Sequence, residues 1–164
     1  MPFVLSENRK QPEEVVHAFR RYSQYLASVK PRLPSSAYEL ATSGWYFDPR
    51  DHRCPHDAWL ESLTIREDLC DSIHLPRCVE VAIRLLGAYH DGYIELHYPD
   101  VRAYSFGGKP ATGGKGHGDW LYDEFRLSEN GLLLHEIEWE VGRWEIEATD
   151  VVFGWAPTER PSPA

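Results

Sequence analysis

A chain of 164 residues, 42% hydrophobic and 26% charged, is long enough to fold as one domain without a disulfide or a metal ion. Its formal net charge of −9 argues against binding to nucleic acid or to anionic lipid. No apolar run approaches a membrane span, and the apolar opening residues are too few for a signal peptide. Three cysteines, an odd number, favour a reducing compartment, so we predict a cytoplasmic protein.

The first predicted element is a helix from about Pro12 to Val29. Proline is common in a first helical turn, and Glu13 and Glu14 complement the positive end of the helix dipole. Apolar side chains recur at steps of three and four residues, which is typical of a helix that packs on a sheet through one face. This stripe consists of Val15, Phe19, Tyr22, Leu26 and Val29.

Within residues 35–57 the sequence pattern predicts only a short helix, which begins near Ser36 and ends before Gly44. After residue 57 the hydrophobic period changes to two, which indicates strands. We place them near 59–65, 79–85, 93–98, 101–106, 120–127, 132–140 and 143–149, with 151–155 as a continuation.

The predicted fold class is therefore α+β: an N-terminal helix packed on a curled or partly closed antiparallel β meander of six to eight strands. Residues 1–155 form a single domain. The Pro/Ser-rich residues 156–164 form a disordered tail.

A turn at Asp91-Gly92 predicts the register of one hairpin. The dipeptide is typical of a type I′ turn, which pairs His90 with Tyr93. That register brings the apolar faces of the two strands together.

A second turn, at residues 128–131, places two polar residues on an apolar face. Gly131 can take the left-handed position of a three-residue loop, which pairs Ser128 with Leu132. Asp123 and His135 then lie one diagonal step apart. They are candidates for a general acid/base pair. We favour the plainer interpretation, a hydrogen-bonded core pair or a polar gap at the edge of the sheet, because structural ion pairs also shift pKa values. No nucleophile with a recognised spacing accompanies the two residues.

The segment 52–56 contains three residue types that bind zinc: His52, Cys54 and His56. Cys70 and Cys78 follow at predicted strand ends, where a lone thiol is often a small apolar side chain. Because the spacing has no matching second pair, we predict no metal and no cofactor.

Negative charge is concentrated between residues 119 and 150, a segment that contains ten Asp and Glu residues but two Arg residues. Strand alternation directs five glutamates outward on two adjacent strands. They are either a solvated face or a docking surface for a basic protein partner. These residues are Glu136, Glu138, Glu140, Glu145 and Glu147.

Four short motifs are the basis of a family resemblance: His56-Asp57 before a strand, the segment 96–101, Gly118-Asp119 and 135–137. In these the chain resembles small uncharacterised bacterial β-rich domains, some of which are proposed immunity proteins of polymorphic toxin systems. The resemblance covers about residues 57–155. It implies a binding role and carries over no catalytic residues.

Two functions follow as hypotheses. The first is a non-enzymatic, immunity-type protein-binding domain that uses the acidic face. The alternative is a small hydrolase or small-molecule-binding domain with a pocket near Asp123 and His135. A cavity with convergent polar groups would favour the alternative, and a flat acidic face without a cavity would favour the first.

Overall fold

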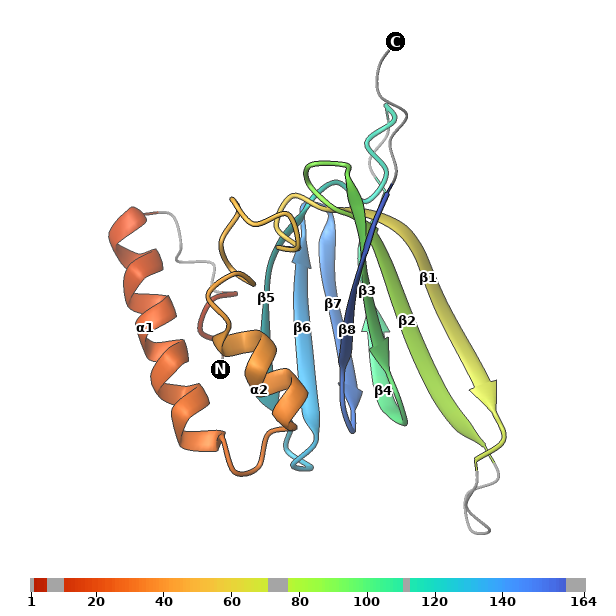
Figure 1. Cartoon of the computed structure of the whole chain (residues 1–164). Coiled ribbons are helices and arrows are strands. Elements are labelled where there is room, and N and C mark those ends of the chain that lie inside the picture. The colour runs from red at the N-terminus through yellow and green to blue at the C-terminus, as the bar shows by residue number, and fades with distance from the viewer. Residues whose placement is uncertain (1, 6–10, 71–76, 111–112, 159–164) are drawn as a thin grey trace.

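The computed structural model describes residues 2–5, 11–70, 77–110 and 113–158, which contain two helices and eight strands (Figure 1). In chain order these are α1 (Pro12–Val29), α2 (Ser35–Thr42), β1 (Trp59–Asp68), β2 (Cys78–Leu86), β3 (Gly92–Tyr98), β4 (Val101–Phe106), β5 (Trp120–Leu127), β6 (Leu133–Trp139), β7 (Gly142–Ala148) and β8 (Val152–Pro157). The α+β class is confirmed, and α1 has the predicted bounds.

The strands form two antiparallel sheets, one in the order β1-β2-β3-β8 and one in the order β4-β7-β6-β5. The two sheets lie one behind the other, as a sandwich (Figure 1). The prediction of one curled or partly closed meander is therefore wrong, since there are two sheets and neither closes. The chain changes sheet between β3 and β4, where Asp100 has a positive φ of 46°. It returns at the end, when β8 pairs with β3.

The two predicted turns differ in outcome. The β5–β6 turn is as predicted, with the Ser128 N–H donating to the Leu132 carbonyl at 2.8 Å and Gly131 at φ 75°. The β2–β3 turn is longer than predicted, because the Gly87 N–H closes the loop on the Gly92 carbonyl. Leu85 consequently pairs with Ile94. The register moves by an even number of residues, so the predicted apolar face is unchanged.

The helices cover the flank of the sandwich formed by β5 and β8 (Figure 1). In α1 the side chains of Tyr22, Leu26 and Val29 are buried, whereas Val15 and Phe19 are half-buried. The Tyr22 hydroxyl donates to the Phe125 carbonyl at 3.0 Å and accepts from the Phe125 N–H at 2.6 Å. Side chains of α1 thus take the place of a neighbouring strand at the free edge of β5.

The opposite flank consists of β1 and β4, which end their sheets and have no further strand beside them in the described residues. Ile65 and Tyr104 are 44% and 49% exposed there. At the end of β1 a disulfide joins Cys70 to Cys78, so the interpretation of these two residues as lone thiols is wrong. Disulfides are typical of oxidising compartments, and the cytoplasmic location, which rested on unpaired cysteines, stays a prediction.

Two further observations concern the chain as a whole. No helix among the described residues is long and apolar enough to cross a membrane. Ala156 and Pro157, assigned to the tail in the sequence analysis, belong to β8 and pair with Tyr93 and Gly92. The N–H of Thr158, the next residue of the predicted tail, donates to the Asp91 carbonyl at 2.8 Å. Residues 159–164, the remainder of that tail, lie outside the described part of the chain.

Candidate functional site

A buried polar network joins the two sheets around Asp123 on β5. Its carboxylate accepts hydrogen bonds from the Tyr46 hydroxyl at 2.8 Å and from the Trp120 indole N–H at 3.1 Å. The His135 Nε2 lies 2.8 Å from the same carboxylate, which confirms the predicted diagonal neighbourhood. His135 Nδ1 lies 2.6 Å from the hydroxyl of Tyr98 on β3. Asp123 and His135 are 1% and 0% exposed.

The hydrogen-bond pattern assigns the protons of this network. If His135 is neutral with its proton on Nε2, it donates to Asp123 and accepts from the Tyr98 hydroxyl, and every polar hydrogen has a partner. A second proton, on Nδ1, would leave the Tyr98 hydroxyl proton without a partner among the described residues. The arrangement therefore favours one buried negative charge, on Asp123, held by three donors.

Together with burial, the negative charge of Asp123 contributes to raised pKa values of neighbouring side chains. Burial raises the pKa of Tyr46 and of Tyr98 well above the usual value for a phenol, and the negative charge of Asp123 raises both further. The pKa of Cys54 is raised to about 12, again by burial first, with Asp123 contributing. The two tyrosines thus stay protonated hydroxyls, and the thiol is unreactive.

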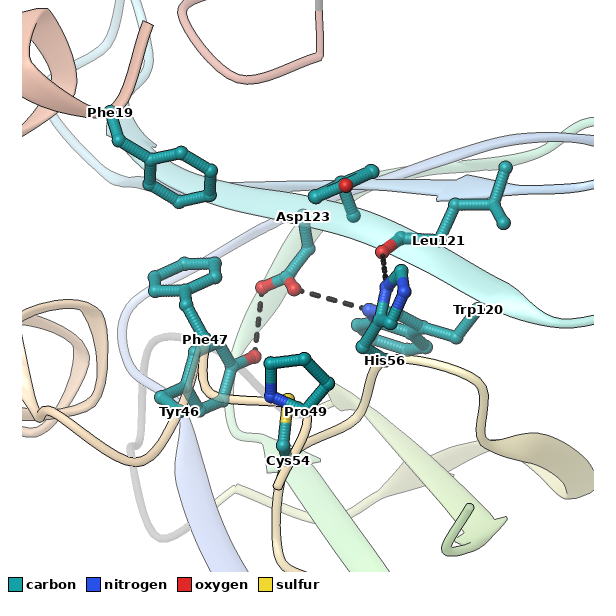
Figure 2. A pocket seen from close by; sticks show the side chains of 10 residues that line it. Phe19, Tyr46, Phe47, Pro49, Cys54, His56, Trp120, Leu121 and Asp123 are labelled. Atoms are coloured by element: carbon teal, nitrogen blue, oxygen red, sulfur yellow. Dashed lines mark hydrogen bonds between the residues drawn. The ribbon is translucent and has the colours of Figure 1, made fainter. Parts of the chain in front are cut away.

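A partly enclosed pocket opens beside Asp123 (Figure 2). Its volume is about 140 Å³, which is close to the roughly 150 Å³ of a cavity that holds one benzene molecule. Cys54 and His56 line it together with five aromatic residues, which are Phe19, Tyr46, Phe47, Trp120 and Tyr122. The walls are thus mainly apolar, and Asp123 supplies the carboxylate.

The predicted zinc candidates do not meet in the structure. The His52 ring stacks on Tyr89 and its Nδ1 lies 2.5 Å from an Asp91 oxygen. His56 Nδ1 lies 2.5 Å from the Leu121 carbonyl, and Cys54 is buried. In the ranges that the structure describes, no three His, Cys, Asp or Glu residues are grouped as metal ligands.

Only part of the predicted acidic face is exposed. The predicted exposure of Glu136 is wrong: its side chain points outward but is buried, and it forms an ion pair with Arg126. Glu140 and Glu145 are exposed, as predicted. Glu138 is half-buried, opposite Arg143 in the next strand. Glu147, also half-buried, accepts hydrogen bonds from Ser128 and Asn130.

The cause of this difference is a cover over the outer face of β5 and β6. Buried Glu124 lies directly opposite Glu136, and Arg126 contacts both carboxylates. The N–H groups of Phe3 and Val4 donate to Glu124 at 2.9 and 2.7 Å. Strand alternation assigns these carboxylates to solvent, because it contains no information about an N-terminal segment that folds back on them.

The pocket residues from 46 to 54 were not predictable, because they lie within residues 35–57, for which the sequence predicts only a short helix. Tyr46 and Phe47 come from the turns that follow α2, where no periodic pattern exists. The signal that could have indicated a wall is the run Trp45-Tyr46-Phe47, an unusual concentration of aromatic residues in a polar loop.

Comparison of this chain with family models, with curated protein sequences and with solved structures finds no match. The resemblance to immunity-type domains thus stays a prediction.

Proposed function

We propose that this protein is a small-molecule-binding domain whose site is the pocket beside Asp123. The observation that supports this function most is the combination of a mainly aromatic wall with one buried carboxylate that carries no neighbouring Lys or Arg among the pocket's described residues. Binding sites for small ligands commonly combine apolar walls with a few polar groups that orient the ligand. The volume of about 140 Å³ limits the ligand to roughly the size of one six-membered ring.

We do not extend the proposal to hydrolysis. A general acid or base must reach the reacting group, and His135 is completely buried with both ring nitrogens already in contact with Asp123 and Tyr98. The thiol of Cys54 has a pKa of about 12, raised mainly by burial, and makes a poor nucleophile.

The immunity-type protein-binding function has less support than the sequence alone suggested. Of the five glutamates proposed to bind a basic partner, Glu140 and Glu145 are exposed. Glu140 itself accepts a hydrogen bond from the Asp119 N–H at 3.1 Å. This function remains a second proposal that rests on those two carboxylates.

Binding can be tested through the indole N–H of Trp120, which lies in the pocket and donates to Asp123. We expect at least one ligand from a set of ring-sized compounds to shift the Trp120 indole signal in an NMR titration. Phe19→Leu, which removes one aromatic wall, should weaken that response several-fold. Phe106→Leu is the matched control, a half-buried aromatic residue outside the pocket lining.

A folded protein whose Trp120 signal responds to no compound of the set would contradict the proposed function. An equal loss of binding in both variants would also count against it, because the effect would then not belong to the pocket.

A further inference from the structure

The charge in the pocket indicates what kind of ligand it suits. The hydrogen bonds of Asp123 come from Tyr46, Trp120 and His135, and the proton assignment above leaves these donors neutral. No Lys or Arg lines the pocket in the described part of the chain. Asp123 therefore keeps a net negative charge at the pocket, and a charge in such surroundings acts more strongly than it would in water.

The walls are suited to a positive charge as well. The face of an aromatic ring carries partial negative charge and attracts a cation within about 6 Å of its centre. Five aromatic side chains and Asp123 surround one small space, in which Figure 2 shows the rings of Phe19 and Phe47 beside the Asp123 carboxylate. Several aromatic faces with a carboxylate behind them form the type of cage that binds alkylated ammonium groups.

An inorganic cation fits these walls less well. Metal ions need several oxygen, nitrogen or sulfur ligands, and the oxygens of Asp123 are already engaged by Tyr46, Trp120 and His135. An alkylated ammonium ion needs no such ligands, because its charge is spread over its alkyl groups, which can contact the aromatic rings directly.

We propose that the pocket takes a small organic ammonium ion, with its alkyl groups against Phe19 and Phe47 and its charge directed toward Asp123. This inference rests on the proposed function and adds the chemical class of the ligand. The pocket volume of about 140 Å³ sets the size at a trimethylammonium or tetramethylammonium group.

The test compares two compounds that differ only in charge: choline and its neutral carbon analogue 3,3-dimethylbutan-1-ol. Both are titrated into the full chain while the Trp120 indole signal is followed by NMR. We expect choline to bind about tenfold more tightly than the neutral compound. Asp123→Asn, which removes the charge at nearly constant shape, should bring the two affinities close to each other.

Phe47→Leu supplies an independent arm that does not depend on the fold of the Asp123 variant. It keeps an apolar side chain but removes a ring, so choline should lose several-fold in affinity while the neutral compound changes less. Phe106→Leu, outside the pocket, should change neither affinity.

The outcomes separate the two proposals. Equal binding of choline and its neutral analogue in the wild type would overturn the ammonium inference but leave the small-molecule function standing. A Trp120 signal that responds to neither compound would overturn the ammonium inference, and the function would then depend on the wider compound set. A choline preference that survives in Asp123→Asn and Phe47→Leu alike would place the cation elsewhere and would also overturn the inference.

Discussion

The two flanks of the sandwich differ in how their edge strands are covered: the helical flank is closed and the other is open. At the helical flank, the free edge of β5 is hydrogen-bonded by side chains: Tyr22 to Phe125, Tyr25 to the Leu127 N–H at 2.8 Å, and His56 to the Leu121 carbonyl. At the other flank, β1 and β4 end their sheets with no further strand beside them in the described residues.

The covering of the β5 edge also explains where the pocket forms. The turns that cover β5 also bring Tyr46, Phe47 and Cys54 to the Asp123 carboxylate, so the pocket forms where the edge is closed by irregular chain. On the open flank, β1 is almost entirely exposed and relies on charged residues such as Arg66 and Glu67. Charged side chains are a common protection against pairing of an exposed edge with another chain.

The largest expected effect tests the closed flank. Tyr22→Phe removes the hydroxyl that serves both the N–H and the carbonyl of Phe125, and leaves two buried polar groups unpaired. Each such group costs about 1–3 kcal/mol, so we expect the free energy of unfolding to fall by about 3 kcal/mol in a urea titration.

The matched control is Tyr104→Phe on the open flank, where the ring is 49% exposed. Its effect should stay within about 0.5 kcal/mol. If the two variants lose equal stability, the hydroxyl of Tyr22 does not stabilise the edge of β5 and the comparison of the flanks fails.

A smaller effect is expected at the open flank, where the Cys70–Cys78 disulfide closes a short loop with a sequence separation of 8. Replacing both cysteines by serine should lower the free energy of unfolding by about 2 kcal/mol in the absence of reductant, because a short loop restricts the unfolded chain only modestly. Thiol titration of the unfolded, unreduced wild type should detect one thiol, Cys54. Detection of three thiols would show that the disulfide does not form.

The parts of the fold that were predictable are those with a regular period. The bounds of α1 follow from its apolar stripe, and the β5–β6 register follows from Gly131 and from the burial of Phe125 and Leu133. Alternation assigns each residue to a face, and for Asp123 and His135 this was sufficient to place them together.

The division into two sheets was not predictable in this way, since period-two alternation states which face a residue occupies but not which strands pair. The pairing of β8 with β3 joins residues about 60 positions apart and leaves no local signal. The same limit applies to the pocket, because Tyr46 reaches Asp123 from a loop without periodicity. The prediction that Glu136 is exposed was wrong for a related reason. Arg126 pairs with Glu136, and the distant N-terminal segment binds Glu124 on the same face, which alternation cannot indicate.

The smallest expected effect is a pH dependence of stability at the closed flank, where the N-terminal segment covers Glu124 on β5. Burial raises the pKa of Glu124 above its usual range, while the N–H groups of Val4 and Phe3 and the charge of Arg126 oppose the rise. The pKa of Glu124 is thus higher in the folded protein than in the unfolded chain, and the folded state holds the proton more tightly. This contribution to stability is complete below the unfolded pKa and is lost as pH rises through the folded pKa.

The stability of the wild type relative to Glu124→Gln should therefore decrease as the pH is raised from about 4 to 7, a window that contains the ordinary carboxyl pKa. Urea titrations of both proteins at several pH values measure the difference. Tyr25→Phe is a control on the same flank, because it removes a hydrogen bond to Leu127 but no carboxylate, and its difference from the wild type should stay constant. A relative stability that rises with pH would mean that the bonds from Phe3, Val4 and Arg126 outweigh burial. The N-terminal segment would then be held mainly by the charge of Glu124, and the closed flank would depend on an ionised carboxylate instead of tolerating one.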